Sequence, residues 1–484
     1  MASKGKKILI VASEFEPLTK VGHLGRVTSN LACTLNQLGS DVRIVIPKYD
    51  SIPEEYTENA ALLHEFEVTL GRRQYPCSVY KTEFKEVPVY LVSAGEYFEQ
   101  EQVYTNVNND IERFACFCFA VLKMLSFLDF DPDVIQCHDW QISYIPILYT
   151  TNMEHLVYRK NFKLLFVIHS MQYQGICSRY DMLDLLDLPS EFFSPSTLEF
   201  YGQANSLKGG LLFSNKLVTV SQTYAKEIKH SYYGENLEGI IRNRYSDLKG
   251  IMCGIDMDLF NPMTDTEIHA NYDFSTHQEK KTLNKLHLQK LVSLKKDPNT
   301  PLICITSDVL DYNKGMDLIK RVFDDIIRLD IQLLVAHKTK SGFSAYFKSK
   351  AVEFPGKVAY IDCNHTISET QLLSGSDILL RPSRVEPCGE KHLIALRYGT
   401  IPIVRETGGL ADIVVPYDEE TGEGNGFSFT NYNAHDMLYT INRALDIYMN
   451  NRPLWDQLIE KGMRVECSWI DTAKKYREIY SSMR

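Results

Sequence analysis

The sequence lacks the signatures of several protein classes. No apolar run approaches the ~20 residues that cross a bilayer, which argues against a membrane-spanning protein. The eleven cysteines include no CxxC pair, so a structural zinc site has no ligand spacing to support it. The chain also has no low-complexity tract and no internal repeat with a period of about 20–50 residues, which excludes the common repeat architectures.

The composition is that of an ordinary globular chain with an acidic balance. Hydrophobic residues make up 44% and charged residues 24% of the 484 positions. A length of about 100–200 residues per domain predicts two to four domains. The net charge of −10 argues against nucleic acid or an anionic membrane as a partner. Cysteines in apolar stretches, such as Cys116, Cys118 and Cys304, indicate reduced thiols and predict a cytoplasmic location.

Short apolar, β-branched runs alternate with helical patterns along the whole chain. The first run, after Met1–Lys7, is too short for a signal peptide and soon meets Glu14, so it is interpreted as a buried strand. Nearly continuous apolar runs are typical of parallel strands that are covered on both faces. The predicted strands are Ile8–Ala12, Val42–Ile46, Val89–Val92, Val134–Ile135, Leu164–Ile168, Leu217–Val220, Leu302–Ile305, Ile331–Ala336, Val358–Ile361, Ile378–Leu380 and Ile401–Val404.

Helical periodicity is clearest after Lys314. Apolar residues recur there at the spacing of one helix face: Met316, Ile319, Val322, Phe323, Ile326 and Ile327. Strands that alternate with such helices predict doubly wound α/β sheets, and their number predicts two sheets with a break near Asn243–Gly254. The charge-rich segment Lys280–Lys296 is predicted to be a solvated helix.

Ligands of open α/β sheets bind beyond the carboxyl ends of the strands, so the loops there are the candidate sites. The loop Ser13–Val27 follows the first strand and places Lys20 and a glycine just before a helix, where backbone N–H groups attract phosphate. An ordinary strand-to-helix turn is the alternative. His138 and His169 both follow strands, although a single such histidine is more often a hydrogen-bonded structural residue.

Three further loops lie in the second half of the chain. Lys314-Gly315 opens the amphipathic helix, Glu386 lies on a loop before a short helix, and Thr407–Gly409 forms a Thr-Gly-Gly turn at a helix start. A surface acid is the alternative for Glu386. If both sheets present their carboxyl ends to a shared cleft, two lysines and two helix N-termini converge on a diphosphate leaving group. No Asp-rich motif accompanies them, so no metal is expected.

These loops, in this order, resemble those of bacterial glycogen synthases and plant starch synthases over almost the whole chain. The stretches that carry the resemblance are ILIVASEFEPLTKVG, NDIERFACFCFAVL, HDWQ, SLKGGLLFSNKLVTVSQTYAKEI, GIDMDLFNP, NKGMDLI, SRVEPCG with ALRYGT, TGGLAD and CSWIDTAKKYREIY.

The resemblance implies the GT-B fold, in which two Rossmann-like, doubly wound parallel-sheet domains face each other across a cleft. Its implied ranges are 1–248 for the acceptor-side domain, 249–460 for the domain that binds the nucleotide sugar, and 461–484 for a helix that returns to the N-terminal domain.

The resemblance also implies residue roles. Lys20 and Gly22 match the donor-phosphate loop, His169 a histidine near the reacting sugar, and Asp139 an acid that lines the cleft. Those in the second half are Lys314 at the donor diphosphate, Glu386 as the catalytic glutamate, Cys388 and Gly389 beside the glucose, and Thr407, Gly408 and Gly409 at the diphosphate.

The implied reaction extends the non-reducing end of an α-1,4-glucan with glucose from ADP-glucose, or sometimes UDP-glucose, with retention of configuration. The partners are then a nucleotide sugar and a glucan, with no cofactor, and the oligomeric state stays open. Breaking the anomeric bond leaves positive charge on the sugar and negative charge on the diphosphate, which Lys20, Lys314 and the helix N-termini are placed to stabilise.

The sequence departs from the family at the donor site. The family pattern is K-x-G-G-L-A-D. In this chain, His23 stands in place of the second glycine, and Arg26 stands in place of the acidic residue. Asp308 stands in the region where the family has an arginine, and Cys253 replaces an asparagine before Gly-Ile-Asp. After E-P-C-G, the usual L-T-Q is Glu390-Lys391-His392. Arg26 and Lys391 are candidates to supply, from new positions, the positive charge that the family's arginine would provide.

Three hypotheses therefore stand. The first is an active α-glucan synthase with an altered donor site. The second is a catalytically impaired paralogue that binds glucan or nucleotide or partners an active synthase. The third is a GT-B transferase that uses another sugar donor.

Overall fold

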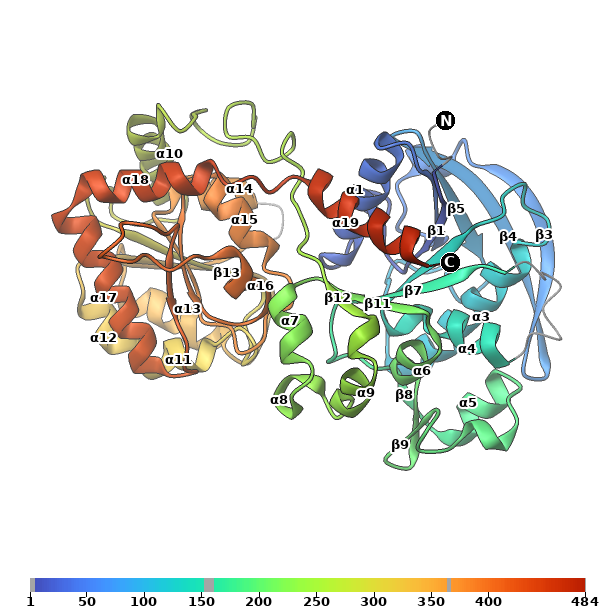
Figure 1. Ribbon diagram of the computed structural model, residues 1–484. Helices are drawn as coiled ribbons and strands as arrows, with labels where there is room; N and C mark the ends of the chain where they lie inside the picture. The colour runs from blue at the N-terminus through green and yellow to red at the C-terminus, as the bar shows by residue number, and fades with distance from the viewer. Residues whose placement is uncertain (1–4, 152–160, 364–366, 484) are drawn as a thin grey trace. The chain divides into compact units, whose positions relative to one another are not determined.

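The chain divides into two units, each built on one large sheet (Figure 1). The computed structural model describes residues 5–151, 161–363 and 367–483. The first unit comprises Met1–Val220, Ala225–Ile251 and Trp469–Arg484, and the second comprises Ser221–Tyr224 and Met252–Ser468. The second unit therefore includes four residues, Ser221–Tyr224, that lie between two segments of the first unit in the sequence.

Within the described residues, the sheet of the first unit has nine strands in the order β12-β11-β7-β6-β1-β2-β5-β4-β3. Their bounds are β1 (Lys7–Val11), β2 (Asp41–Pro47), β3 (Ala61–Leu70), β4 (Arg73–Phe84), β5 (Val87–Ser93), β6 (Val134–His138), β7 (Lys163–Ile168), β11 (Lys216–Thr219) and β12 (Leu248–Gly250). The six predicted strands of this half are present and pair in parallel.

The antiparallel hairpin β3–β4 at the edge of this sheet was not predicted. Most residues of β3 are exposed, so it has no continuous apolar run. A smaller sheet has the order β8-β10-β9 (Ile176–Cys177, Gln203–Asn205 and Glu199–Phe200).

The helices of the first unit include one from the end of the chain. They are α1 (Leu24–Gln37), α2 (Glu54–Thr57), α3 (Val107–Met124), α4 (Tyr144–Thr151), α5 (Arg179–Leu185), α6 (Ser206–Phe213), α8 (Ser231–Gly234), α9 (Glu238–Asn243) and α19 (Trp469–Ser482), while α7 (Gln222–Glu227) spans the unit boundary. Helix α19 packs against α1 (Figure 1), and Arg477 Nη1 donates to the Leu38 carbonyl at 3.2 Å.

In its described part, the second unit has a parallel sheet of six strands in the order β15-β14-β13-β16-β17-β18. The strands are β13 (Leu302–Val309), β14 (Gln332–Thr339), β15 (Val358–Asp362), β16 (Ile378–Arg381), β17 (Ile401–Arg405) and β18 (Phe427–Phe429). The helices are α10 (His277–Leu291), α11 (Met316–Arg321), α12 (Phe323–Arg328), α13 (Ser344–Glu353), α14 (Glu369–Gly375), α15 (Glu390–Arg397), α16 (Gly408–Ile413), α17 (Ala434–Asn450) and α18 (Arg452–Met463).

Two helix predictions in this unit were wrong in detail. The periodic segment after Lys314 forms two short helices, because the backbone leaves the helical region at Val322 (φ −115°, ψ 20°). Helix α10 is not a fully solvated helix, since Lys281 and Lys285 are buried. Lys285 is paired with the buried Asp377 at 2.7 Å, so its charge is neutralised inside the unit.

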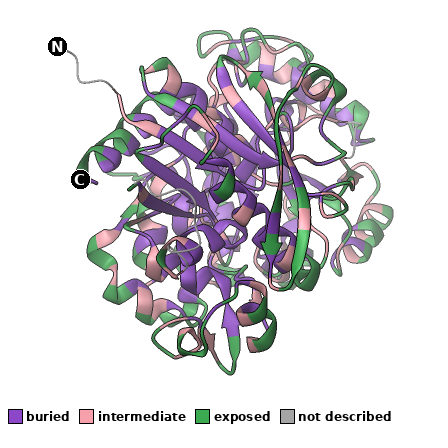
Figure 2. Cartoon of the chain, turned by 90° about the vertical axis from the view of Figure 1, so that its right-hand side faces the viewer, coloured by how far each residue is buried: buried purple, intermediate pink, exposed green. Residues whose placement is uncertain are grey.

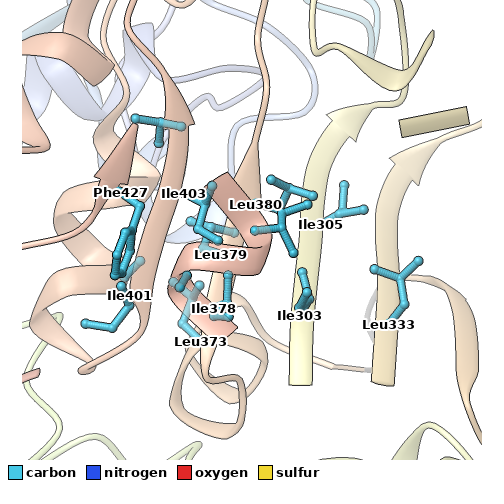
Figure 3. Close-up of a cluster of buried hydrophobic side chains, with 14 of the residues drawn as sticks. Ile303, Ile305, Leu333, Leu373, Ile378, Leu379, Leu380, Ile401, Ile403 and Phe427 are labelled. Atoms are coloured by element: carbon cyan, nitrogen blue, oxygen red, sulfur yellow. The ribbon is translucent and has the colours of Figure 1, made fainter. Parts of the chain in front are cut away.

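Figure 3 shows part of the larger of two buried hydrophobic clusters in the described part of the second unit. Ile303 and Ile305 of β13 pack in the same buried cluster as Leu333 of β14 and Ile403 of β17. Figure 2 shows that most strands are buried and that the helices have exposed outer faces, whereas β3 is largely exposed. Within the described ranges, no helix has both the length and the apolar character that a bilayer crossing requires.

The packing predicts how much the free energy of unfolding falls when a core side chain is shortened. Ile303 is fully buried, so Ile303→Ala is expected to lower the free energy of unfolding by about 2–5 kcal/mol. Val352 on α13 is 77% exposed, so Val352→Ala should change it by about 0.5 kcal/mol or less. Urea denaturation followed by circular dichroism measures both, and equal losses in the two variants would contradict the assignment of the core.

Candidate functional site

In the first unit, three neighbouring parallel strands carry the predicted residues. Strands β7, β6 and β1 are adjacent, so the loops after them meet at one edge of the sheet. The loop after β1 carries Lys20 and Gly22, Asp139 follows β6, and His169 follows β7. The structure thus brings Asp139 and His169 together, because Asp139 Oδ1 accepts the His169 backbone N–H at 2.7 Å.

The loop after β1 is organised around the buried carboxylate of Glu14. Its Oε2 accepts the backbone N–H groups of Val21 at 2.8 Å and Gly22 at 2.9 Å. Its Oε1 accepts the hydroxyl of Tyr104 at 2.6 Å. A carboxylate of the protein itself therefore occupies the amide donors that were predicted to receive a phosphate.

A second carboxylate in this loop, Glu16, binds two cations. Lys20 Nζ lies 2.7 Å from Glu16 Oε1, and Arg26 Nε lies 3.1 Å from Glu16 Oε2. Burial opposes the charge of Glu16, but Arg26 and Lys20 outweigh burial and lower its pKa. The arginine that replaces the acid of the family pattern is thus paired within its own loop.

Asp139 has unusual backbone dihedral angles and a raised side-chain pKa. Its φ of 57° and ψ of −177° lie in a region that L residues rarely adopt. Burial raises the pKa of Asp139 to about 7, although the backbone N–H groups of His169 and Ser170 act in the opposite direction. A carboxyl group that changes charge near neutrality is therefore fixed beside His169.

Three histidines form a hydrogen-bonded row at this edge. His138 Nδ1 lies 2.8 Å from His169 Nε2, and His169 Nδ1 lies 3.2 Å from His23 Nε2. The backbone at His23 is right-handed (φ −79°, ψ −17°), a conformation open to any L residue. The side chain at position 23 therefore fits the loop without backbone strain.

In the second unit, the residues after β13, β16 and β17 surround Glu386. These strands are neighbours, so their carboxyl ends also meet at one edge. Lys314 Nζ donates to both Glu386 oxygens, at 3.1 and 2.9 Å. Arg381 Nε lies 3.2 Å from Oε2, to which Ser383 Oγ donates at 3.0 Å. Burial raises the pKa of Glu386, but Lys314 and Arg381 outweigh it and hold this pKa well below its usual range.

Close backbone contacts explain two glycines of this site. Gly315 has a φ of +75°, and a Cβ there would overlap the Pro382 carbonyl. A Cβ at Gly409 would overlap the Cys388 carbonyl, and the Gly409 N–H donates to the Glu386 carbonyl at 3.0 Å. These contacts fix the two loops on either side of Glu386.

The other predicted residues of this unit lie around the same loop. Gly389 precedes α15 with a φ of +80°, and Gly408 begins α16. Cys388 is buried, and its thiol together with burial raises the pKa of Cys253. The cysteine that replaces the family's asparagine is thus an uncharged thiol beside Cys388.

The substituted charges at the end of β13 also find partners. Asp308 lies 3.1 Å from Lys338 Nζ and 3.4 Å from Lys391 Nζ. Burial raises the pKa of Asp308, but the two lysines outweigh it and hold this pKa well below its usual range. Lys391 is therefore bound by a carboxylate in this structure.

Several contributing residues were not predicted. Arg381 and Ser383 contact Glu386, Glu14 binds the loop amides, and Tyr104 binds Glu14. The motif RPSRVEPCG placed Arg381 at the end of a predicted strand, which was the one available signal. No group of three or more His, Cys, Asp or Glu side chains suited to a metal occurs in the described ranges.

Comparisons with known proteins cover the full length of the chain. The family model described as "Starch synthase catalytic domain" matches residues 7–243, and "Glycosyl transferases group 1" matches residues 289–464. The chain is 42% identical to a glycogen synthase of Clostridium acetobutylicum over 479 residues, which cover 99% of this chain and 100% of that protein.

Among solved structures, the catalytic domain of Arabidopsis thaliana starch synthase IV, bound to ADP and acarbose, is similar with a TM-score of 0.90 at 29% identity, covering 99% of both chains. Sucrose-phosphate synthase of Thermosynechococcus elongatus shares the fold, with a TM-score of 0.63 at 15% identity over 99% of both chains. These similarities confirm the predicted α/β fold of the GT-B class with parallel sheets.

The raised pKa of Asp139 predicts a pH-dependent stability. Because its pKa is about 7 in the folded protein and lower in the unfolded chain, the unfolded state loses the proton first as pH rises. Its contribution to stability therefore falls between about pH 4 and pH 7. Asp139→Asn keeps a side-chain oxygen that can accept the His169 N–H. The Tm of this variant minus the Tm of the parent protein should therefore be larger at pH 8 than at pH 4.5. A Tm difference that is the same at both pH values would contradict this.

Proposed function

The chain belongs to the family of bacterial glycogen synthases and plant starch synthases, and we propose that it transfers glucose from ADP-glucose, or from UDP-glucose, to the non-reducing end of an α-1,4-glucan. Glucosyl transfer in glycogen or starch synthesis is the activity of its full-length relatives. In the proposed reaction the anomeric configuration is retained, and no metal takes part.

The observation that carries this proposal is the state of Glu386. Its carboxylate is held by Lys314, Arg381 and Ser383 and stays ionised over the working range of pH. An ionised group cannot protonate a leaving oxygen, so general acid catalysis is not its role. A fixed negative charge can instead stabilise the positive charge that develops on the sugar ring as the anomeric bond breaks.

The second unit is proposed to hold the donor. Lys314 would contact the diphosphate while it keeps its contact with Glu386, and Thr407, Gly408 and Gly409 at the start of α16 would approach the phosphates through their backbone. Cys388 and Gly389 would lie beside the glucose. A lysine between a carboxylate and a diphosphate stabilises the leaving group as its negative charge grows.

In the first unit, Lys20 and Gly22 are proposed to bind a donor phosphate. Lys20 now pairs with Glu16 through a side chain that is 39% exposed. An exposed ion pair of this kind contributes only about 0–1 kcal/mol, so a diphosphate with two negative charges can compete for the lysine. Arg26 keeps Glu16 neutralised when Lys20 exchanges its partner.

Asp139 and His169 are proposed to contact the reacting glucose. The His169 backbone N–H donates to Asp139 Oδ1, which fixes the Asp139 carboxyl group beside His169 at one end of the sheet, where a sugar can meet both residues. Because the pKa of Asp139 is about 7, this group can both donate and accept hydrogen bonds near neutrality.

A hollow of about 470 Å³ in the first unit is a candidate for acceptor binding. It lies beside the loop of Lys20 and is lined by Pro17–Val21, Ser51, Pro53 and Glu101–Tyr104. Its mixture of apolar and polar groups fits the faces and hydroxyls of a glucan.

The impaired-paralogue alternative is not favoured. The similarity covers both domains at full length, and the charges around Glu386 are all in place. The departures at positions 23, 26 and 308 each have a partner in the structure, so none of them leaves an unmatched charge in its loop. A different sugar donor stays open to the assay below.

A cytoplasmic location is proposed as well. The eleven cysteines are all free thiols, and nine of them are buried. Buried, unpaired thiols are typical of proteins that work in a reducing compartment.

The proposed activity predicts glucose incorporation into glycogen from radiolabelled ADP-glucose or UDP-glucose. Glu386→Gln keeps the size of the side chain but removes its charge, so kcat should fall by at least about 10²–10³-fold. Lys314→Ala should cause a loss of similar order, because it removes a cation at the leaving group. The matched control is Glu353→Gln on the surface of α13, which should leave turnover unchanged.

No incorporation from either nucleotide sugar by the parent protein would contradict the proposal, and so would full turnover by Glu386→Gln. Incorporation only from a third sugar donor would overturn the donor assignment. Calorimetry with ADP on Lys314→Ala reports separately on the diphosphate contact, since weaker ADP binding is expected there.

A further inference from the structure

A continuous line of five side chains crosses the first unit from its last helix to the loop of His23. Tyr480 on α19 donates to Gln136 Oε1 at 2.6 Å, and Gln136 Nε2 lies 2.8 Å from His138 Nε2. His138 Nδ1 lies 2.8 Å from His169 Nε2, and His169 Nδ1 lies 3.2 Å from His23 Nε2. Four of the five side chains are essentially buried, so water does not compete along most of the line.

With the Gln136 amide oriented as it is in the structure, the line has only one direction in which every bond has one donor and one acceptor. An amide nitrogen can only donate, so Gln136 Nε2 requires an acceptor at His138 Nε2. Neutral His138 then carries its proton on Nδ1 and donates to His169 Nε2. His169 in turn carries its proton on Nδ1 and donates to His23 Nε2. The hydroxyl of Tyr480 holds the Gln136 amide in this orientation through its oxygen.

The same arrangement keeps the histidines uncharged. A protonated His138 or His169 would present an N–H group to a neighbouring donor, which breaks the line. Burial lowers the pKa of His138 to about 3. Burial, together with His138 and His23, lowers the pKa of His169 well below its usual value.

We propose that His23, which stands where the family pattern has glycine, is a positioning residue that locks His169 as the neutral Nδ1–H tautomer, and that the Gln136 amide, anchored by Tyr480, sets the direction of this lock from the far end. The inference rests on the proposed function, because it concerns the histidine assigned to the reacting sugar. It deepens that function by assigning His169 a fixed, uncharged imidazole whose two nitrogens are both engaged, so that it transfers no proton in the reaction.

The proposal accounts for a histidine at this position. A glycine at position 23 has no side chain to accept the His169 Nδ1–H, so the ring would lose one of its two anchors. The right-handed backbone at His23 accommodates the side chain without strain. The tautomer of His169 therefore also depends on where α19 lies, because the Tyr480 hydroxyl that anchors Gln136 is on that helix.

The tautomers can be observed directly by ¹⁵N NMR of the full-length protein labelled at histidine, with the His169 signals assigned by their loss in His169→Gln. We expect the parent protein to show a protonated Nδ1 and an unprotonated Nε2 at neutral pH. Tyr480→Phe frees the Gln136 amide to turn, so a population with the proton on Nε2 should appear. Tyr180→Phe, at a side chain that is 80% exposed, is the control and should leave the signals unchanged.

Variants at position 23 separate the hydrogen bond from the bulk of the side chain. His23→Gln offers a carbonyl acceptor to His169 Nδ1–H, whereas His23→Leu offers none. In the glucosyl transfer assay, His23→Leu should lower kcat by up to about tenfold, because that is the usual worth of one hydrogen bond, while KM for the donor changes by less than about twofold. His23→Gln should restore most of kcat, and the exposed His230→Leu should behave as the parent protein.

Two results would overturn the proposal: a parent protein with the His169 proton on Nε2, or equal losses of kcat in His23→Leu and His23→Gln. The NMR measurement needs no turnover, so it tests the lock even if neither nucleotide sugar is a substrate. Absence of turnover with the expected tautomer would count against the proposed function alone.

Discussion

The second unit is arranged around the buried negative charge of Glu386. A carboxylate removed from water costs several kcal/mol unless cations and hydrogen-bond donors compensate for it. Lys314 and Arg381 supply the charge, and Ser383 supplies a further donor. The close backbone contacts at Gly315 and Gly409 hold the loops that make this possible, because any side chain there would push the loops apart. The requirement to neutralise one carboxylate thus explains the glycines as well as the cations.

The first unit also holds carboxylates in a loop, but it stabilises one with backbone amides and the other with two cations. Its loop after β1 contains two carboxylates, and Glu14 takes up backbone amides while Glu16 takes up Lys20 and Arg26. An anionic ligand at this loop would therefore meet donors that already have partners. The exposed pair at Lys20 exchanges at little cost, whereas the buried amide contacts of Glu14 do not. Lys20 is for this reason the better candidate for a contact that forms and breaks in each catalytic cycle.

Residues that depart from the family pattern contact partners in the structure. Arg26 meets Glu16, Asp308 meets Lys338 and Lys391, and His23 meets His169. In the sequence each substitution is a single unusual residue, and its partner lies up to 146 positions away. Each of these substituted residues therefore has a partner within its own unit.

The sequence by itself determined the parallel strands, since runs such as Leu164–Ile168 and Ile401–Val404 are apolar on both faces and have no other stable environment. It also placed Lys314 and Glu386 on loops that follow strands. Only the tertiary structure decided which charges meet, because ion pairs such as Lys314–Glu386 depend on strand order and on side-chain direction, and neither leaves a periodic signal. The hairpin β3–β4 and the buried face of α10 were hidden for the same reason: exposed strands and paired lysines look polar in a sequence, and burial depends on what packs against them.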